Sequence, residues 1–466
     1  MIFIDVKKKT ALFVFLLFQI LLSSCVQTAG LKPKQPITLT MWHNFGGQMQ
    51  DSMNDLIEEF NTSIGKEKGI VISITSISGT ASLQEKLTMI AADDPGSPEM
   101  PDIATCYPAT AVLLADKGLI ISMDQYFTDA ELKDYLPQFL AEGRLPDKKL
   151  YVFPFAKSTE VLFLNKTLFE RFSSDTGITI DDLATFEGIA ETAMKYYEWT
   201  DEQTPGIQND GKSFYTADSF FNLVQVGMVQ LGSSLFYDGK LQLNNAEFQH
   251  IWNVIFEPAV KGGYAIYDGY SSDLAKTGDI ICSTGSTAGI LFYGNEITYP
   301  DNTKEKIEYV ILPYPTFEGG EKVAIQRGSG LIVAKSTPQK EEAAALFLKW
   351  FTSPEQNMRF VSSTGYLPIT HQAFTNYMEK GMAENTDINI KKLFPAALKV
   401  YNEFDFYIPP VFDEYNSIAE NFESGFSVLA AQKRKQYLEY LKHYTAEQAY
   451  EKAANNALND FIQQLR

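Results

Sequence analysis

A match to the phosphate-binding P-loop pattern is the most specific chemical motif in this sequence. Residues 206–213 read Gly-Ile-Gln-Asn-Asp-Gly-Lys-Ser and fit GxxxxGK[ST] letter for letter. A phosphate cradle needs a buried strand directly before the glycines and a helix N-terminus directly after the lysine. The preceding segment, residues 198–205, is polar and ends in Pro205. We therefore interpret residues 206–213 as a surface loop.

Patterns for catalysis or metal binding are missing from the sequence. It contains no GxSxG elbow, and Gly328-Ser329-Gly330 precedes an apolar strand pattern where a dinucleotide fingerprint would follow one. The 58 acidic residues always provide some pair of carboxylates, so such a pair carries no information about glycoside hydrolysis. The four histidines have no ligand spacing: His43, His250, His371 and His443. We expect no catalytic residues, no metal and no cofactor.

The N-terminus has the features of an export signal. Lys7 to Lys9 precede a short apolar run that ends in Leu22-Ser23-Ser24-Cys25. This ending resembles a bacterial lipobox, in which the cysteine receives diacylglycerol and becomes the mature N-terminus. We predict a signal peptide at residues 1–24, lipidation at Cys25 and a linker at residues 25–36; an uncleaved signal anchor is the alternative.

The composition narrows the possible classes of protein and of partner. A formal net charge of −19 over 466 residues argues against nucleic acid or an anionic lipid surface as a partner. The length predicts two domains, and a hydrophobic content of 45% excludes global disorder. Cys106 and Cys282 each lie in an apolar stretch, so they are either buried thiols or a disulfide of the exported protein.

The elements that must position a site alternate between strand and helix. Apolar strand patterns are followed by helical stripes in the first hundred residues after the linker, which favours βαβ units and a mostly parallel sheet. A second α/β region follows Tyr151, and the last hundred residues read as helices. The expected strands lie at residues 37–42, 70–74, 101–104, 161–164, 280–281 and 330–334.

Five segments, taken in order, resemble the family 1 extracellular solute-binding proteins, the sugar and glycerol-phosphate receptors of ABC importers. The longest is Pro154-Phe155-Ala156-Lys157-Ser158-Thr159-Glu160 with the apolar run up to Lys166. The others are Trp42-His43, Ser283-Thr284-Gly285-Ser286, the helix ending in residues 350–355, and the segment 363–370. The resemblance covers roughly residues 37–372.

The resemblance implies an α/β fold with two Rossmann-like lobes joined by crossover hinge strands, the periplasmic-binding-protein type II fold. It places the N-lobe at residues 37–158 and 287–328, and the C-lobe at residues 159–286 and 329–466. A ligand would be held in the cleft between the lobes.

The same resemblance, together with the side-chain chemistry, gives a set of candidate ligand-binding residues. Ser158 and Ser286 are expected at the crossovers, and Gly328 would let the backbone approach a ligand closely. Aromatic rings suit the apolar and hydroxyl-bearing faces of a sugar, although core packing is the alternative for each of them. The aromatic candidates are Trp42, Tyr107, Tyr366, Phe214 and Tyr215.

The sequence departs from the glycerol-3-phosphate receptors that it resembles most. A phosphate-binding arginine of that subgroup falls at Asp405, where an acidic side chain would repel a phosphate. A subgroup glutamate falls near Pro108, and a subgroup tyrosine falls near Ser82 or Leu83. A neutral carbohydrate is therefore favoured over a phosphorylated ligand.

We expect a substrate-binding lipoprotein of an ABC importer, exported and lipid-anchored at the cell membrane, facing a periplasm or the outside. It would capture a carbohydrate, or a related polyol or glycerol phosphate, by hinge closure and deliver it to a permease. We expect a monomer whose partners are the ligand and the transmembrane subunits of the permease. Two alternatives remain: a secreted glycoside hydrolase, and a surface lipoprotein that binds macromolecules.

Overall fold

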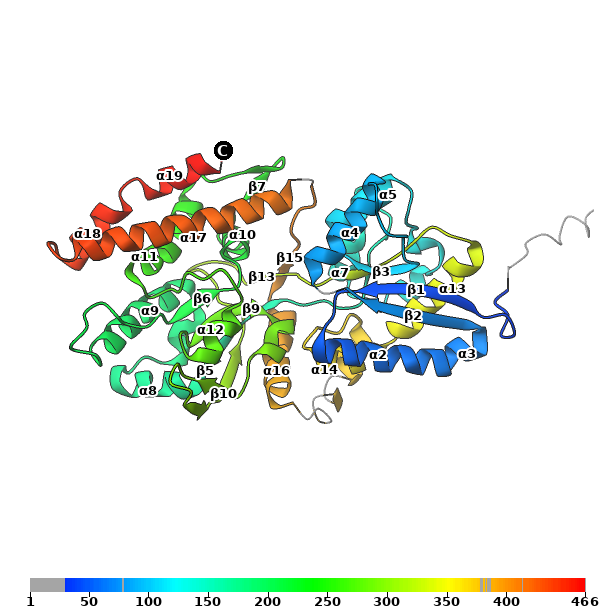
Figure 1. The fold of residues 1–466 in the computed structure, drawn as a ribbon, viewed down its shortest axis with the longest axis horizontal. Helices are drawn as coiled ribbons and strands as arrows, with labels where there is room; N and C mark the ends of the chain where they lie inside the picture. Colours follow the sequence, from blue (N-terminus) through cyan, green and yellow to red (C-terminus); the bar gives the residue numbers. More distant parts are fainter. Residues whose placement is uncertain are drawn as a thin grey trace, which may run out of the picture.

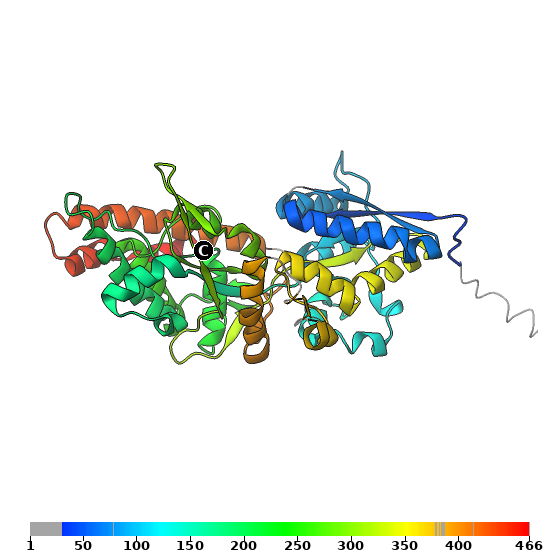
Figure 2. The ribbon, with the colours of Figure 1, turned by 90° about the horizontal axis from the view of Figure 1, so that it is seen from below.

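The computed structural model describes residues 30–465, except residues 78, 378–379, 382, 384–386 and 413. Within this part of the chain, two α/β lobes lie side by side along the long axis of the molecule (Figures 1 and 2). The predicted signal peptide and Cys25 lie outside the described residues. None of the described helices has the length and apolar character needed to cross a membrane.

The first lobe is built on a five-stranded sheet in the order β2-β1-β3-β14-β4. Its strands are β1 (Ile37–His43), β2 (Ile70–Ser76), β3 (Ile103–Cys106), β4 (Phe153–Pro154) and β14 (Gly330–Val333). β1 runs parallel to β2 and β3, whereas β14 runs antiparallel to β3 and β4. Its helices are α2 (Gly47–Thr62), α3 (Ile64–Lys68), α4 (Thr80–Ala92), α5 (Pro108–Asp116), η1 (Met123–Gln125), α6 (Asp129–Leu132), α7 (Pro137–Gly143), α13 (Pro338–Phe351), α14 (Pro354–Thr364) and η4 (Ala373–Tyr377).

Apolar spacing explains how these helices are placed. The predicted stripe on α2 recurs every three to four residues and is buried; it consists of Met49, Met53, Leu56, Ile57 and Phe60. Pro338 begins α13, as predicted, and the Thr337 side chain accepts a hydrogen bond from the Lys340 backbone N–H. The sheet therefore presents the carboxyl ends of β1, β2 and β3 toward the second lobe (Figure 1).

The second lobe is built on a four-stranded sheet in the order β12-β5-β9-β6. Every residue of β5 (Glu160–Asn165) is buried, as the apolar run 161–164 predicted for a central strand. The other strands are β6 (Tyr215–Ala217), β9 (Cys282–Ser286) and β12 (Tyr309–Leu312), with the small pairs β7 (Phe236–Tyr237) and β8 (Lys240–Leu241), and β10 (Glu296–Thr298) and β11 (Lys304–Lys306).

Helices surround this second sheet, and the last ones of the chain form an outer layer (Figure 1). The helices within the lobe are α8 (Lys166–Thr176), η2 (Ile180–Ala184), α9 (Phe186–Asp201), α10 (Phe220–Gln230), α11 (Ala246–Lys261), α12 (Ser271–Thr277) and η3 (Thr287–Phe292). They are followed by α16 (Ile388–Glu403), α17 (Tyr415–Tyr440), α18 (Ala446–Ala454) and α19 (Ala457–Gln464). Where the lobes meet, β13 (Val323–Ile325) pairs in parallel with β15 (Asp405–Tyr407).

The predicted fold class, two α/β lobes with crossover strands, is confirmed. The strands of the first region, β1, β2 and β3, run parallel as predicted. Antiparallel strands complete both sheets, because β14 runs antiparallel to β3 and β4, and β5 runs antiparallel to β9 and β12. β5 enters the second lobe from the hinge, so it runs opposite to β9, whose carboxyl end points back toward the hinge. Both sheets are therefore mixed.

The predicted lobe boundaries need correction. β12 pairs with β5, so most of the segment 287–328 belongs to the second lobe. β14 pairs with β3, and α13 and α14 pack against β1 and α2, so this part of the predicted C-lobe lies in the first lobe. The reason is that the chain crosses between the lobes at residues 155–159 and 326–329, and again between η4 and α16. It does not cross after Ser286.

Candidate functional site

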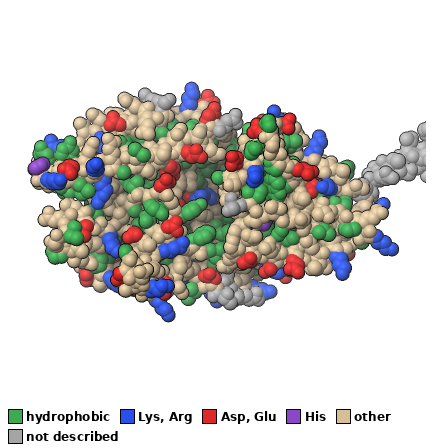
Figure 3. All heavy atoms as spheres, in the orientation of Figure 1, with side chains coloured by type: hydrophobic (Ala, Val, Ile, Leu, Met, Phe, Trp, Pro, Cys, Tyr) green, Lys and Arg blue, Asp and Glu red, His purple; other side chains and the backbone are tan. Residues whose placement is uncertain are grey.

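The space between the two lobes is the candidate ligand site. The carboxyl ends of the parallel strands β1, β2 and β3 face it, and in open α/β sheets ligands bind at such ends. The space-filling view shows a hollow where the lobes meet, with hydrophobic side chains bordering it (Figure 3). A cavity of about 410 Å³ bridges the lobes: Leu113 and Pro146 line it from the first lobe, and Phe412 and Asn416 from the second. Glu160 and Arg327 do not line this cavity.

The first-lobe wall is a chain of hydrogen-bonded polar groups on the loops after the parallel strands. The Asn44 side-chain amide donates to the Thr80 hydroxyl at 2.7 Å, and the Thr105 hydroxyl donates to the Asn44 side-chain oxygen at 3.0 Å. The Tyr107 hydroxyl is hydrogen-bonded to Thr80, and burial raises the pKa of this phenol. Tyr107, a predicted site residue, thus stands at the start of α5 with its hydroxyl in a polar row.

Tyr366 lies at the same wall, beside the hinge. Its ring packs against Phe45 and Phe360, with centroids 6.0 and 6.1 Å away. Burial raises the pKa of its hydroxyl, which also lies within electrostatic range of Tyr107 and Arg327. The structure therefore brings two predicted aromatic residues together. Trp42 is half-buried against the small core beneath α4 and α5, so its contact with a ligand stays a prediction.

Two crossing segments pair with each other at the hinge. The Ser158 backbone N–H donates to the Arg327 carbonyl at 2.9 Å, and the Arg327 N–H donates to the Ser158 carbonyl at 2.8 Å. The Leu367 N–H donates to the Lys157 carbonyl on the neighbouring strand. Ser158 is thus at a crossover, as predicted, and is buried there.

Gly328 is required by the hinge itself. Its φ is +94°, and a Cβ at this position would lie 2.1 Å from the Ala156 carbonyl oxygen of the other crossing segment. Gly328 therefore allows a close approach between the two crossing segments, and its contact with a ligand stays a prediction.

A buried ion pair supports the same crossing segments. Lys157 Nζ lies 2.7 Å from a carboxylate oxygen of Glu142 on α7, and the two side chains are only 2% and 9% exposed. The ammonium also donates to the Gly328 carbonyl, and the Gln326 amide donates to the Glu142 carboxylate. The pair ties both crossing segments to the first lobe.

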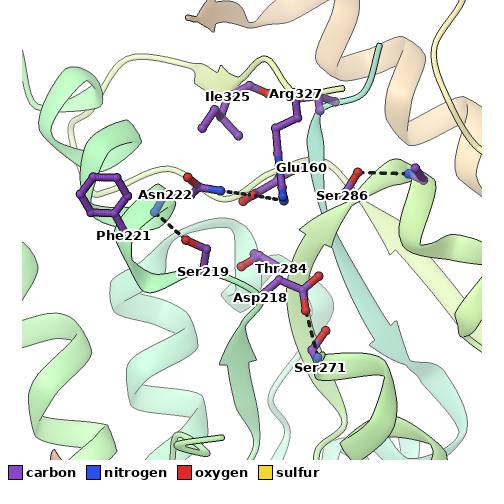
Figure 4. Close-up of polar contacts among 12 residues, drawn as sticks. Glu160, Asp218, Ser219, Phe221, Asn222, Ser271, Thr284, Ser286, Ile325 and Arg327 are labelled. Atoms are coloured by element: carbon purple, nitrogen blue, oxygen red, sulfur yellow. Dashed lines mark hydrogen bonds and ion pairs between the residues drawn. The ribbon is translucent and has the colours of Figure 1, made fainter. Parts of the chain in front are cut away.

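An acidic and amide-rich group forms the second-lobe wall (Figure 4). Glu160, which begins β5 directly after the hinge, is 2% exposed and accepts hydrogen bonds from Arg327 at 3.0 Å and from Asn222 at 3.1 Å. Burial raises the pKa of Glu160, and the Arg327 charge opposes that shift. The Arg327 side chain is 37% exposed, which fits a group that reaches into a solvent-filled cleft. The nearby Asp218 carboxylate accepts from the Ser271 N–H at 2.9 Å.

The N-terminus of α10 and the segment after β15 extend this wall. Ser219 caps α10 and donates to Glu423 at 2.5 Å, while burial raises the pKa of that carboxyl group. Tyr407 and Tyr415 both donate to the Gln225 side-chain oxygen. The wall therefore combines carboxylates, amides and phenols, the groups that bind hydroxyl-bearing ligands.

Three other predicted residues have different places. Ser286 is opposite Glu160 in the β5–β9 pairing and caps η3, so it lies at the cleft edge of the lobe but not at a crossover. Phe214 and Tyr215 are both 0% exposed. Phe214 packs in an aromatic cluster with Phe172, and the Tyr215 hydroxyl bonds to Thr284 at 2.6 Å. The predicted aromatic platform at Phe214 and Tyr215 is wrong, because both side chains belong to the core.

The remaining candidates from the sequence are the P-loop match, the two cysteines, a metal site and Asp405. Residues 206–210 are exposed and irregular, and the segment leads into β6 instead of a helix, so the interpretation as a surface loop is confirmed. Cys106 and Cys282 are free, buried thiols in β3 and β9 of different lobes. Among the described residues, no three His, Cys, Asp or Glu side chains converge to hold a metal ion. Asp405 is exposed at the start of β15.

Sequence reasoning missed the charged centre of the cleft. Arg327 and Glu160 were not singled out, although each adjoins a residue that was, Gly328 or the Ser158 segment. Two signals for these residues were available in the sequence: an acidic residue at the start of an apolar strand, and an arginine before a glycine. Asp218 and Asn222 left no comparable signal, because their position depends on how β6 meets α10.

Two α/β lobes joined by crossing strands, with a polar cleft between them, form the type II fold of periplasmic binding proteins. The chain belongs to the bacterial extracellular solute-binding protein family, whose model matches residues 55–388. It is 24% identical over 364 residues to the sn-glycerol-3-phosphate-binding periplasmic protein UgpB of Rhizobium meliloti (strain 1021), covering 74% of this chain and 78% of the relative.

Solved structures support the same fold. The cyclic alpha-maltosyl-1,6-maltose binding protein from Arthrobacter globiformis superposes with a TM-score of 0.67 at 19% identity, covering 92% of this chain and 99% of that one. UgpB from Mycobacterium tuberculosis, solved in complex with glycerophosphocholine, gives a TM-score of 0.65 at 17% identity, with the same coverage of both chains.

Proposed function

We propose that this chain is the substrate-binding lipoprotein of an ABC importer that captures a carbohydrate or polyol and delivers it to a permease. The observation that carries the proposal is the polar cleft around Glu160 and Arg327, which opens on the hinge. Closure of the lobes would bury a ligand there, and a ligand that prefers the closed state shifts the population toward it.

The charges of the cleft favour a neutral ligand. Arg327 is already paired with Glu160, and Asp218 lies close enough to influence both groups. A phosphate would have to compete with Glu160 for the arginine and approach Asp218, and like charges brought together in a cleft are unfavourable. The preference for a neutral ligand thus rests on Glu160 and Asp218 and does not need Asp405, which is exposed at the start of β15.

Relatives and neighbours supply the ligand panel. Those proteins are named for, or were solved with, sn-glycerol 3-phosphate, maltose, mannotriose, ribitol and glycerophosphocholine. We further propose lipidation at Cys25, a monomeric state, and contact with the membrane only through the lipid and the permease.

A thermal-shift screen of the mature protein against this panel tests the proposal. A ligand at 100 times its Kd stabilises the folded state by about 2.7 kcal/mol. The substitution Tyr366→Ala should abolish the shift while leaving the far-UV circular dichroism unchanged. A shift from glycerol 3-phosphate alone would overturn the preference for a neutral ligand.

The hydrolase alternative is tested in parallel. Purified protein incubated with oligosaccharides should release no new reducing ends, and their appearance would overturn the proposed function.

A further inference from the structure

A second cavity lies beside the strand pair β13–β15, where the lobes meet (Figure 1). Its volume of about 340 Å³ is in the range of small-molecule sites. η2 and the end of β12 form one side, and the end of α16 with the residues that begin β13 and β15 forms the other. Glu160 and Arg327 do not line it. We call it the hinge-side cavity; its lining includes Leu183, Leu312, Tyr314, Lys322, Lys399 and Phe404.

The hinge-side cavity borders both strands of this pair. Lys322 lies directly before β13 and Phe404 directly before β15, and the Asp405 N–H donates to the Lys322 carbonyl at 2.9 Å. β13 packs against α10 of the second lobe, whereas the centroid of the Phe406 ring on β15 lies 6.1 Å from that of Phe139 in the first lobe. A molecule in the cavity would therefore touch the beginning of a strand pair that contacts both lobes.

Tyr314 places an unused hydrogen-bonding group beside the cavity. The residue lines the cavity and is only 2% exposed, and its hydroxyl has no hydrogen-bond partner within the part of the chain that the structure describes. Buried hydroxyl groups in native proteins almost always have a partner, which is protein, water or a ligand. This phenol also lies within electrostatic range of Glu160 and Arg327. Tyr314 thus links the cavity to the charged pair of the cleft.

Apolar side chains form much of the cavity wall. Leu183 comes from η2, Leu312 from β12, and Phe404 from the residue after α16. Ile180 and Pro313 extend this apolar surface. Such a wall favours a ligand with an apolar group, because removing apolar surface from water is favourable. A sugar or a small polyol has no such group.

Charges of both signs stand at the rim of the cavity. Lys322 and Glu403 form an ion pair at 2.6 Å and neutralise each other. Asp181 on η2 and Lys399 on α16 line the cavity from its two sides, and both are exposed. Lys399 is within electrostatic range of Glu403, but among the described residues no hydrogen bond or ion pair occupies its side chain or that of Asp181. A free carboxylate and a free ammonium match a ligand that carries both charges itself.

We propose that the hinge-side cavity is an effector site for an α-amino acid with an apolar side chain, and that its occupation restrains the β13–β15 pair. The apolar side chain fills the cavity, the ammonium pairs with Asp181 and the carboxylate pairs with Lys399. An effector that binds one arrangement of the lobes more tightly shifts the population toward it. The site lies outside the cleft, so the proposal does not depend on which solute the cleft binds.

Calorimetric titration of the mature protein tests the site directly. The probes are leucine and phenylalanine, with glycine, isocaproate and isoamylamine as analogues that lack the side chain, the ammonium or the carboxylate. Leucine or phenylalanine should bind at least tenfold more tightly than each analogue. Equal binding of an analogue with one charge would overturn the assignment of a zwitterion, and no binding of either amino acid would overturn the site.

Four variants locate the bound amino acid. Lys399→Met and Asp181→Asn should each weaken its binding about three- to tenfold. Ala184→Phe should block binding, because it fills the cavity from the rim and keeps the hydrogen bond from the Thr316 N–H to the Ala184 carbonyl. The matched control is Lys391→Met, an exposed lysine of α16 that does not line the cavity and should leave binding unchanged. Equal affinities of the wild type and both charge variants would overturn the proposal.

Hydrogen exchange, followed by mass spectrometry on peptides that cover β13 and β15, tests the effect on the hinge. The Gln326 N–H donates to the Tyr407 carbonyl at 2.8 Å, so its exchange, like that of the Asp405 N–H, reports opening of the strand pair. A saturating amino acid should slow both at least threefold and leave the Tyr299 N–H, in the β10–β11 turn, unchanged. Binding without slower exchange in β13 and β15 would overturn the effector role.

Discussion

The buried ion pair beneath the hinge gives the most quantitative prediction. Lys157→Met removes the ammonium from the Glu142 carboxylate, which is 9% exposed and keeps the hydrogen bond from the Gln326 amide. Breaking a buried pair by removing one partner costs about 3–5 kcal/mol, because an uncompensated charge stays buried. The retained amide hydrogen bond favours the lower end, so we expect a loss of about 3 kcal/mol.

Urea denaturation followed by circular dichroism measures this loss, and a matched surface pair provides the control. Lys442 and Glu439 lie 2.8 Å apart with 61% and 64% of their side chains exposed, so Lys442→Met should cost less than about 0.5 kcal/mol. The double variant Lys157→Met/Glu142→Gln should recover more than half of the loss, because it removes the stranded charge and keeps an acceptor for Gln326. A loss below about 1 kcal/mol for Lys157→Met would refute the reasoning.

Three further predictions follow from the same structure. Gly328→Ala should lower the free energy of unfolding by about 3 kcal/mol or more, because the backbone has a positive φ and the new Cβ would lie 2.1 Å from the Ala156 carbonyl oxygen. Gly177 also has a positive φ but lies in open space, so Gly177→Ala should cost only about 1–2 kcal/mol in the same denaturation assay. Burial lowers the pKa of His43 in the folded protein to about 4. As the pH falls below about 6.5, this histidine therefore binds a proton in the unfolded chain but not in the folded protein. Wild-type stability should drop by up to about 3 kcal/mol between pH 6.5 and 4. The stability of His43→Asn should fall less over that window, and equal slopes would contradict the assignment. Both buried thiols should stay unreactive toward a disulfide reagent until the chain is unfolded, because burial raises their pKa values; rapid reaction of the native protein would contradict the buried state.

Helices and strands were predicted correctly where the spacing of their own apolar residues shows which side is buried. The stripe on α2 from Met49 to Phe60 and the apolar run of β5 each show which side must be covered. Family resemblance then placed Ser158 at a crossover, where it pairs with Arg327, while ligand contact by Tyr107 and Tyr366 stays a prediction. In these cases a short segment carries the information.

The failures share a physical cause. Whether β12 joins β5 or the first-lobe sheet depends on long-range pairing, which local periodicity does not encode. Phe214 and Tyr215 are aromatic and therefore suit a binding platform, but both side chains are buried in the core where the chain enters β6. The Glu160–Arg327 pair joins residues far apart in the sequence, so only the fold brings it together.

The last prediction tests whether Glu160 sets the charge preference of the cleft. Glu160→Gln keeps the size of the side chain and the acceptor for Asn222, but it leaves Arg327 without its anionic partner. The freed guanidinium can bind a phosphate in bidentate fashion, and the net charge of the cleft rises by one. We expect calorimetry to show glycerol 3-phosphate binding at least fivefold tighter than to wild-type protein, with weaker binding of neutral saccharide. The gain should fall as salt is raised, because the new attraction is electrostatic. An unchanged ratio of anionic to neutral affinity would mean that Asp218, and not Glu160, excludes anions from the cleft.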